Sequence, residues 1–251
     1  MATDRGEWFE EEAFWEHYAP IMFESERWAE SPAVVDGLER LCALAPRSRV
    51  LDLCCGMGRI SVELARRGHV VCGVDLCQSY LDAAREYAGD IGLELVHADA
   101  RQFVRPASFD LAVNLYTSFG YFDDPADDAL VIRNLAESLA GGGQLVIEIL
   151  GKETAVRDFT PGERFSRGGF EVTTRFEVVD AWAGLRNTWH LERDGEIFER
   201  SFVQRLYSGT GMRRLLLENG FEQVDLFGDW DGRPYDQRAR VLIARARKAF
   251  Q

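Results

Sequence analysis

Between residues 48 and 150 of this 251-residue chain, short apolar segments alternate with segments whose apolar residues recur at helical spacing. The short segments are apolar at successive positions, so both of their faces must be buried. This pattern is typical of parallel strands covered by helices on both sides, and it predicts an α/β fold. We expect strands over 48–55, 69–76, 93–99, 109–116 and 144–150, and helices over 59–67, 78–90 and 125–140.

The pattern changes after residue 150. Segments 170–179 and 185–193 alternate apolar and polar residues, and Asp194-Gly195 connects the second to a similar segment, 196–207. An Asp-Gly pair between alternating segments is a strong signal for a β-hairpin. We therefore expect three inserted antiparallel strands, then a last helix over 210–220 and two closing strands over 221–228 and 239–247.

The N-terminal residues 7–30 combine acidic with large aromatic side chains. They form either a helix that packs on the rest of the fold or a lid over a pocket, and both remain open. Pro20 is expected to break or start a helix there, because proline has no backbone N–H. Residues 31–45 predict a further helix, with Ser31 as its N-cap and Pro32 at its first position.

Charge and cysteine usage narrow the function classes. The formal net charge is −13 and basic residues form no run longer than a pair, whereas binding to nucleic acid or an anionic membrane normally shows as a positive cluster. The acidic N-terminus lacks a signal-peptide pattern, so we expect a cytoplasmic protein. The five cysteines are odd in number and form no CxxC pair, so we expect reduced thiols packed as small core residues and no metal ion.

A glycine-bearing turn, "LDLCCGMGR" at residues 51–59, joins the first expected strand to the first expected helix. Ligands bind outside the carboxyl ends of strands in such sheets. Gly56 and Gly58 allow a sharp turn and a close approach of the backbone to a ligand. The turn therefore marks a candidate binding site.

Three aspartates, Asp52, Asp75 and Asp99, stand at the ends of the first three expected strands. Carboxylates at these places suit ribose hydroxyls and the amine of an adenine, whereas a phosphate site would prefer basic residues and three open glycines. Each aspartate alone could instead cap the following helix. Their joint placement favours an adenosine-like ligand with a cationic tail.

The stretches "VLDLCCGMGRISVELARRG", "VVCGVDLCQSYLDAAR", "HADA" and "FDLAVNLYTSFGYF", followed by "LAGGGQLVIEI", resemble the motifs of class I S-adenosylmethionine-dependent methyltransferases of the bacterial small-molecule type. The resemblance covers residues 48–150, and "ENGFEQVDLFGDWDG" resembles the last helix and hairpin of that fold. It implies a Rossmann-like, seven-stranded, mostly parallel sheet with helices on both faces and an antiparallel β insert before the last helix. It also implies S-adenosylmethionine as cofactor and S-adenosylhomocysteine as product.

The resemblance implies a role for several residues. Asp52 would hold the methionine end, Asp75 the ribose hydroxyls and Asp99 the adenine amine. The other implied cofactor contacts are Tyr18, Arg27 (at the methionine carboxylate), Cys54, Gly56, Gly58, Leu76, Ala100, Asn114 and Leu115. Cys54 is a departure, because the family usually has glycine there. The candidate catalytic residues are His17, Tyr18 and Tyr116, with His17 chosen for its location and because histidine side chains in general change charge near neutral pH.

These observations predict four parts: an N-terminal cap (1–46), a cofactor-binding core (47–150), a β insert (151–208), and a C-terminal part (209–251) that completes the core. The insert is expected to form a pocket wall, a homodimer face, or both. The expected function is methyl transfer to an oxygen or nitrogen atom of a small molecule, because the "NPPY" type of motif is absent after the fourth strand. The alternatives are a non-catalytic S-adenosylmethionine-binding module and, less favoured, a nicotinamide-dependent oxidoreductase.

Overall fold

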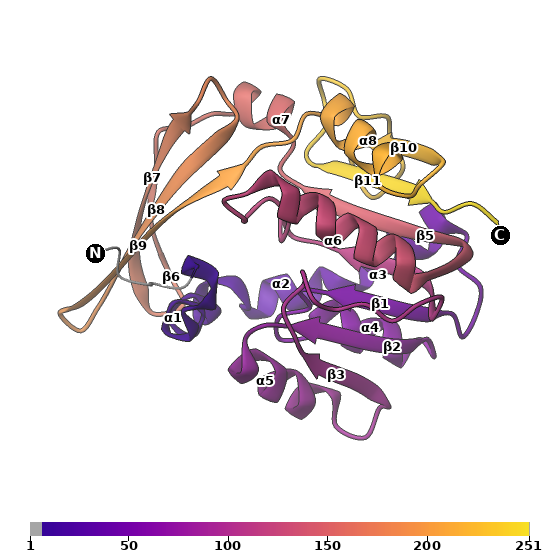
Figure 1. Ribbon diagram of the computed structural model, residues 1–251. Coiled ribbons are helices and arrows are strands. Elements are labelled where there is room, and N and C mark those ends of the chain that lie inside the picture. Colours follow the sequence, from indigo (N-terminus) through magenta and orange to yellow (C-terminus); the bar gives the residue numbers. More distant parts are fainter. Residues whose placement is uncertain (1–6, 251) are drawn as a thin grey trace, which may run out of the picture.

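The computed structural model describes residues 7–250 and contains two β-sheets (Figure 1). The larger sheet is formed by β1 (Arg49–Leu53), β2 (Val70–Asp75), β3 (Leu93–His97), β4 (Phe109–Asn114), β5 (Leu139–Ile149), β10 (Gln223–Phe227) and β11 (Leu242–Arg247). Its strand order is β10-β11-β5-β4-β1-β2-β3, and only the pairs that involve β11 are antiparallel. The expected seven-stranded, mostly parallel sheet is confirmed.

Helices cover both faces of this sheet. The first face carries α3 (Ser31–Cys42) and α4 (Arg59–Arg66), with α5 (Gln78–Ala88) beside α4; the second carries α6 (Pro125–Ser138) and α8 (Gly209–Glu218). On the first face, Leu38 and Leu64 pack with strand residues, and on the second, Ile132 and Leu216 do so. Burial on both faces explains why the strands read as continuous apolar runs.

The second sheet is antiparallel, in the order β6 (Arg164–Arg167), β7 (Phe170–Val179), β8 (Gly184–Arg193) and β9 (Glu196–Arg205). The hairpin expected between β8 and β9 is confirmed: Asp194 and Gly195 both have a positive φ, as the tightest hairpin turn requires. The expectation of three strands was wrong by one, because the short, arginine-flanked β6 carries no alternating apolar pattern.

The N-terminal part forms η1 (Trp8–Glu10), α1 (Glu12–Met22) and α2 (Ser25–Ala29). Ile21 of α1 packs with Phe170, Val172 and Leu191 of the second sheet, so α1 is part of the body of the fold. Pro20 lies inside α1 and does not break it. The helix ends two residues later, so the missing N–H costs one hydrogen bond in its last turn.

Two local expectations are corrected, and one helix was not predicted. Ser31 is the first residue of α3 rather than its N-cap, because α2 runs into α3 through Glu30 alone. The three glycines at 141–143 lie inside β5, where the register with β4 shifts. A further helix, α7 (Lys152–Arg157), follows β5 without having been predicted. No helix among residues 7–250 is long and apolar enough to cross a membrane.

A buried carboxylate joins the second sheet to the core. Asp128 of α6 is fully buried. Its carboxylate accepts hydrogen bonds from Arg205 Nη1 at 2.7 Å and from the Tyr207 hydroxyl at 2.6 Å. Arg205 also donates to the carbonyls of Phe122 and Asp123. The end of β9 is thereby attached to the segment after β4.

We predict that Asp128→Ala lowers the free energy of unfolding by about 3 kcal/mol, because removing one partner leaves the Arg205 charge uncompensated. Urea unfolding followed by circular dichroism measures this. Glu137→Ala, at an exposed position of the same helix, should change the value by less than about 0.5 kcal/mol. Equal effects of the two substitutions would contradict the assigned role of Asp128.

Candidate functional site

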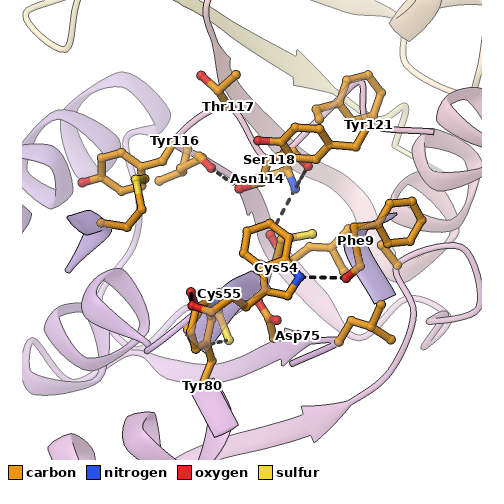
Figure 2. A pocket seen from close by; sticks show the side chains of 18 of the residues that line it. Phe9, Cys54, Cys55, Asp75, Tyr80, Asn114, Tyr116, Thr117, Ser118 and Tyr121 are labelled. Atoms are coloured by element: carbon orange, nitrogen blue, oxygen red, sulfur yellow. Dashed lines mark hydrogen bonds between the residues drawn. The ribbon is translucent and has the colours of Figure 1, made fainter. Parts of the chain in front are cut away.

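A cavity of about 560 Å³ lies outside the carboxyl ends of β1, β2 and β4. Its other walls come from α1, α2, the segment after β4 and the second sheet. Figure 2 shows Cys54 and Asp75 on one side of this cavity and the segment from Tyr116 to Tyr121 on the other. The glycine-bearing turn therefore stands where the sequence predicted a ligand site.

The turn after β1 has left-handed backbone at Cys54 (φ 61°), Gly56 (φ 56°) and Gly58 (φ 78°). A side chain at Gly56 would meet the Phe23 ring at 2.8 Å, and one at Gly58 would meet Ala84 of α5 at 3.0 Å. Gly56 lines the cavity, but Gly58 does not. Gly58 permits the packing of α4 against α5, which corrects its expected place among the cavity-lining residues.

Cys54 and Cys55 do not share one environment. Both line the cavity, but Cys55 is buried whereas Cys54 is only partly buried. Burial raises the pKa of the Cys54 thiol well above its usual value, and nearby Asp75 adds to this. Cys54 is thus a neutral thiol at the cavity, which corrects the expectation that both cysteines are only core residues.

Asp75 ties the end of β2 to this turn. Its Oδ2 accepts a hydrogen bond from the Gly56 N–H at 2.7 Å, and its Oδ1 accepts one from the Cys77 N–H at 2.9 Å. Each oxygen keeps a second lone pair for a ligand. Burial raises the pKa of Asp75, although these backbone donors oppose the shift.

Asp52 lies inside β1 and accepts a hydrogen bond from Ser61 Oγ at 2.5 Å. Burial raises its pKa from 3.8 to about 7, despite the bond from Ser61. Between these two pH values, folded Asp52 retains a proton that the unfolded chain has released. Its contribution to stability therefore falls as pH rises from about 4 to 7.

We predict that Asp52→Asn removes this part of the pH dependence, because an asparagine oxygen still accepts from Ser61 but does not titrate. Urea unfolding at several pH values between 4 and 7 gives the free energies. The wild type should lose stability relative to Asp52→Asn as pH rises, by up to about 1.4 kcal/mol per pH unit. A constant difference between the two proteins across this range would refute the raised pKa.

Asp99 lines the cavity two residues beyond the end of β3, and not at the strand end that was expected. Both of its oxygens accept hydrogen bonds from Arg101, with the closest contact at 2.6 Å. Burial alone would raise the pKa of Asp99, but the bonds from Arg101 lower it. Arg101 also forms ion pairs with Glu7, Glu10 and Asp127, so it joins the N-terminal segment to this end of the cavity.

Asn114, at the end of β4, turns its amide N–H₂ to the carbonyls of Leu53 and Ser118, at 3.1 and 3.5 Å. Its Oδ1 is buried and has no hydrogen-bond partner among the described residues. Leu76, Ala100 and Leu115 also line the cavity, as the sequence predicted.

A charged cluster occupies the cavity beside α2 and α4. The Arg59 guanidinium lies 3.5 Å from the centre of the Tyr116 ring, and Arg59 Nη1 donates to the Arg27 carbonyl at 3.3 Å. Arg27 lines the cavity, as does Glu148, which accepts from the Tyr116 N–H at 2.6 Å. Arg59 was not among the predicted site residues, although its position directly after the glycine-bearing turn could have identified it.

Tyr116 and Thr117 are consecutive non-glycine residues with positive φ, a conformation that costs roughly 1–2 kcal/mol at each position. Strain of this kind gathers at functional sites. The Tyr116 hydroxyl is buried without a hydrogen-bond partner among the described residues, and burial raises its pKa to about 12. Tyr116 therefore stays protonated near neutral pH and does not act as a base.

His17 is not at the cavity, which corrects its expected catalytic location. It stacks on Phe198 at 4.5 Å and contacts the Ala13 carbonyl through Nδ1. Trp15, Tyr18 and Met22 provide the face of α1 that lines the cavity. Successive helical residues point about 100° apart, so His17 cannot share the face of Tyr18.

Comparison with known proteins agrees with this geometry. Residues 50–143 match the family model described as a methyltransferase domain. An S-adenosylmethionine-dependent methyltransferase from Clostridium acetobutylicum has the same fold, with a TM-score of 0.76, 16% identity, and coverage of 94% of this chain and 98% of that one. Residues 50–143 thus form a methyltransferase domain, within the fold of the S-adenosylmethionine-dependent methyltransferases. The cofactor of this domain is S-adenosylmethionine.

Further similar proteins differ in what they act on. A 23S rRNA (uracil-C5)-methyltransferase of Alkalilimnicola ehrlichii is 32% identical over 56% of this chain, but the match spans only 31% of that protein. A cypemycin N-terminal methyltransferase of Streptomyces is 24% identical over 77% of this chain and 80% of its own. CalS10 of Micromonospora echinaspora, an amino pentose methyltransferase solved with S-adenosylmethionine bound, has a TM-score of 0.65, 20% identity, and coverage of 98% and 99%.

The residues present fit this cofactor. Its ammonium and sulfonium groups are cationic, and the cavity offers them the acidic side chains of Asp52 and Asp75 and the amide oxygen of Asn114, which has no partner among the described residues. Gly56 brings bare backbone to the cavity, where a side chain would clash with the Phe23 ring. Arg27 and Arg59 supply positive charge for a carboxylate.

We predict that Asp75→Ala weakens binding of S-adenosylmethionine and S-adenosylhomocysteine at least tenfold, because it removes a ligand for the ribose and the bond that holds Gly56. Isothermal titration calorimetry measures the affinities, and circular dichroism checks the fold. The exposed Asp82→Ala on α5 and Cys54→Ala should bind as the wild type does. Unchanged affinity in Asp75→Ala would refute this cofactor site.

Proposed function

We propose that this chain transfers a methyl group from S-adenosylmethionine to an oxygen or nitrogen atom of a small molecule held between the strand ends and the second sheet. The supporting observation is the continuity of the cavity from Asp75 and Asn114 to Phe176 and Trp189 of the second sheet. The net charge of −13 argues against an RNA substrate. The rRNA relatives match over less than a third of their length, so they support the domain and not the substrate.

The cofactor, when bound, supplies an activated methyl group on a sulfonium. The chain's task is to align the acceptor with that methyl and to exclude water. Asp52, Asp75 and Gly56 would hold the methionine and ribose parts, and Arg27 the carboxylate. Asn114 would lie beside the positive charge of the cofactor, because it lines the cavity and its Oδ1 has no hydrogen-bond partner among the described residues. Tyr18 would close the cavity from α1, where it packs edge-on against Trp189 at 4.8 Å.

The four predicted parts acquire roles in this proposal. Residues 1–46 would cap the cavity, although residues 1–6 lie outside the described part, and 47–150 together with 209–251 would bind the cofactor. The insert, 151–208, would form the acceptor wall. Phe170 and Val172, on the apolar face of β7, pack against α1. This contact supports a role for the insert as a cavity wall. It also removes the reason for expecting a homodimer interface on this face. Small-molecule methylation also fits the expected cytoplasmic location.

The test is calorimetric titration with S-adenosylmethionine, S-adenosylhomocysteine and NAD, followed by incubation of the enzyme with methyl-labelled S-adenosylmethionine and a fractionated cell extract. We expect the first two ligands to bind and the label to enter the small-molecule fraction. Label in RNA would overturn the substrate class. Binding without transfer would favour the non-catalytic module, and NAD binding alone would favour the oxidoreductase.

A further inference from the structure

The inner face of the second sheet carries two amide side chains within an aromatic surface. Asn187 of β8 lies directly opposite Phe176 of β7 and Phe202 of β9. Gln204 stands two residues after Phe202, so it shares the same face of the sheet. All four line the cavity together with Trp189. No residue of β6 to β9 among those lining the described cavity is charged.

The N–H groups of both amides are used inside the protein. Asn187 Nδ2 donates to the Leu185 carbonyl at 3.0 Å, and Gln204 Nε2 donates to the carbonyls of Thr117 and Phe119 at 3.3 and 3.5 Å. No hydrogen bond within residues 7–250 reaches Asn187 Oδ1 or Gln204 Oε1. Asn187 is buried and Gln204 is partly buried, and covering an amide oxygen with a bound molecule is costly unless that molecule pairs with it. These oxygens are therefore suited to accept hydrogen bonds from a bound molecule.

Among the described residues, those of the second sheet that line the cavity include no general base. Burial raises the pKa of Tyr18 and of Tyr121, so both stay protonated near neutral pH. The carboxylates that line the cavity belong to the strand ends, where Asp99 is paired with Arg101 and Glu148 accepts from the Tyr116 N–H. A hydroxyl acceptor needs a base to remove its proton, whereas a neutral amine already presents a lone pair.

The absence of charged side chains on this wall also limits which groups the rest of the acceptor molecule can carry. Arg27 and Arg59 are the cations among the described cavity-lining residues, and both lie at the strand-end side. A phosphate or carboxylate on the acceptor would meet aromatic rings without compensation, which is unfavourable. The rings of Phe176, Trp189 and Phe202 instead suit an apolar or aromatic body.

We propose that the acceptor is a primary or secondary amine on an apolar or aromatic, otherwise uncharged body, and that Asn187 and Gln204 accept hydrogen bonds from its N–H groups. This rests on the proposed function. The nitrogen lone pair forms the new N–C bond while the S–C bond breaks with its electrons on sulfur. The methylated ammonium then releases its proton to water. Desolvation against the aromatic wall favours the neutral amine that this step needs.

The experiment compares sets of compounds that share one body and differ in one group. Tyramine and tryptamine are compared with their hydroxyl counterparts, tyrosol and tryptophol, and with the corresponding arylacetic acids. Binding is measured in the presence of saturating S-adenosylhomocysteine, and turnover as formation of S-adenosylhomocysteine from S-adenosylmethionine. We expect binding and N-methylation among the amines only. The value of kcat/KM should rise with pH up to the pKa of each amine.

Two near-isosteric variants test the amides. Asn187→Leu and Gln204→Met should each raise KM for the amines about tenfold, the loss of one good hydrogen bond, and leave S-adenosylhomocysteine affinity unchanged. Thr188→Val, where the hydroxyl contacts Ser201 away from the cavity, is the matched control and should behave as the wild type.

Several outcomes would overturn the inference while the proposed function stands. These are equal turnover of the hydroxyl compounds, cofactor binding with no amine bound, unchanged KM in both amide variants, and a pH dependence that disappears in Glu148→Gln. The last result would show that the enzyme supplies a base. Failure of S-adenosylmethionine itself to bind would instead refute the proposed function, so the two failures are distinguishable.

Discussion

The hydrogen bond between the Asp75 carboxylate and the Gly56 N–H is the contact on which the cofactor end of the site depends. It joins the end of β2 to the turn after β1, two segments that meet only because their strands are adjacent and parallel. The turn is left-handed at three positions, one of them Cys54. A carboxylate that accepts from this backbone holds the turn open before any ligand arrives, so less order has to be acquired on binding.

The second constraint is that the core sheet cannot enclose a small molecule alone. The strand ends form a floor, and the second sheet forms the opposite wall through β7, β8 and β9. Helix α1 contacts this wall through Ile21 and contributes Tyr18 to the cavity. Charge is concentrated on the floor and aromatic surface on the wall. Under the proposed function, this division would separate the part that recognises a charged cofactor from the part that selects an acceptor.

The fold and the floor of the site followed from the sequence because both depend on local, periodic signals. Buried parallel strands appear in the sequence as apolar runs. Asp75 and Asn114 occupy the ends of two of them, and Asp52 is the next-to-last residue of a third. The short β6 and α7 were missed because four to six residues carry too little periodicity. His17 was misplaced because one step along a helix changes its face. Arg101 could not be recognised because its partners Glu7, Glu10 and Asp127 are distant in sequence and meet only in the folded chain.

Arg101 has a consequence for how the enclosure responds to its surroundings. One guanidinium, flanked by the rings of Phe9 and Phe122, balances carboxylates from the N-terminal segment, the region after β3 and helix α6. Dissolved ions screen such pairs more than they weaken apolar contacts. The attachment of the N-terminal segment beside Asp99 is therefore coupled to ionic strength, whereas the apolar packing of α1 on the second sheet is much less so. Salt thus becomes a means of loosening one end of the cavity's covering before the other.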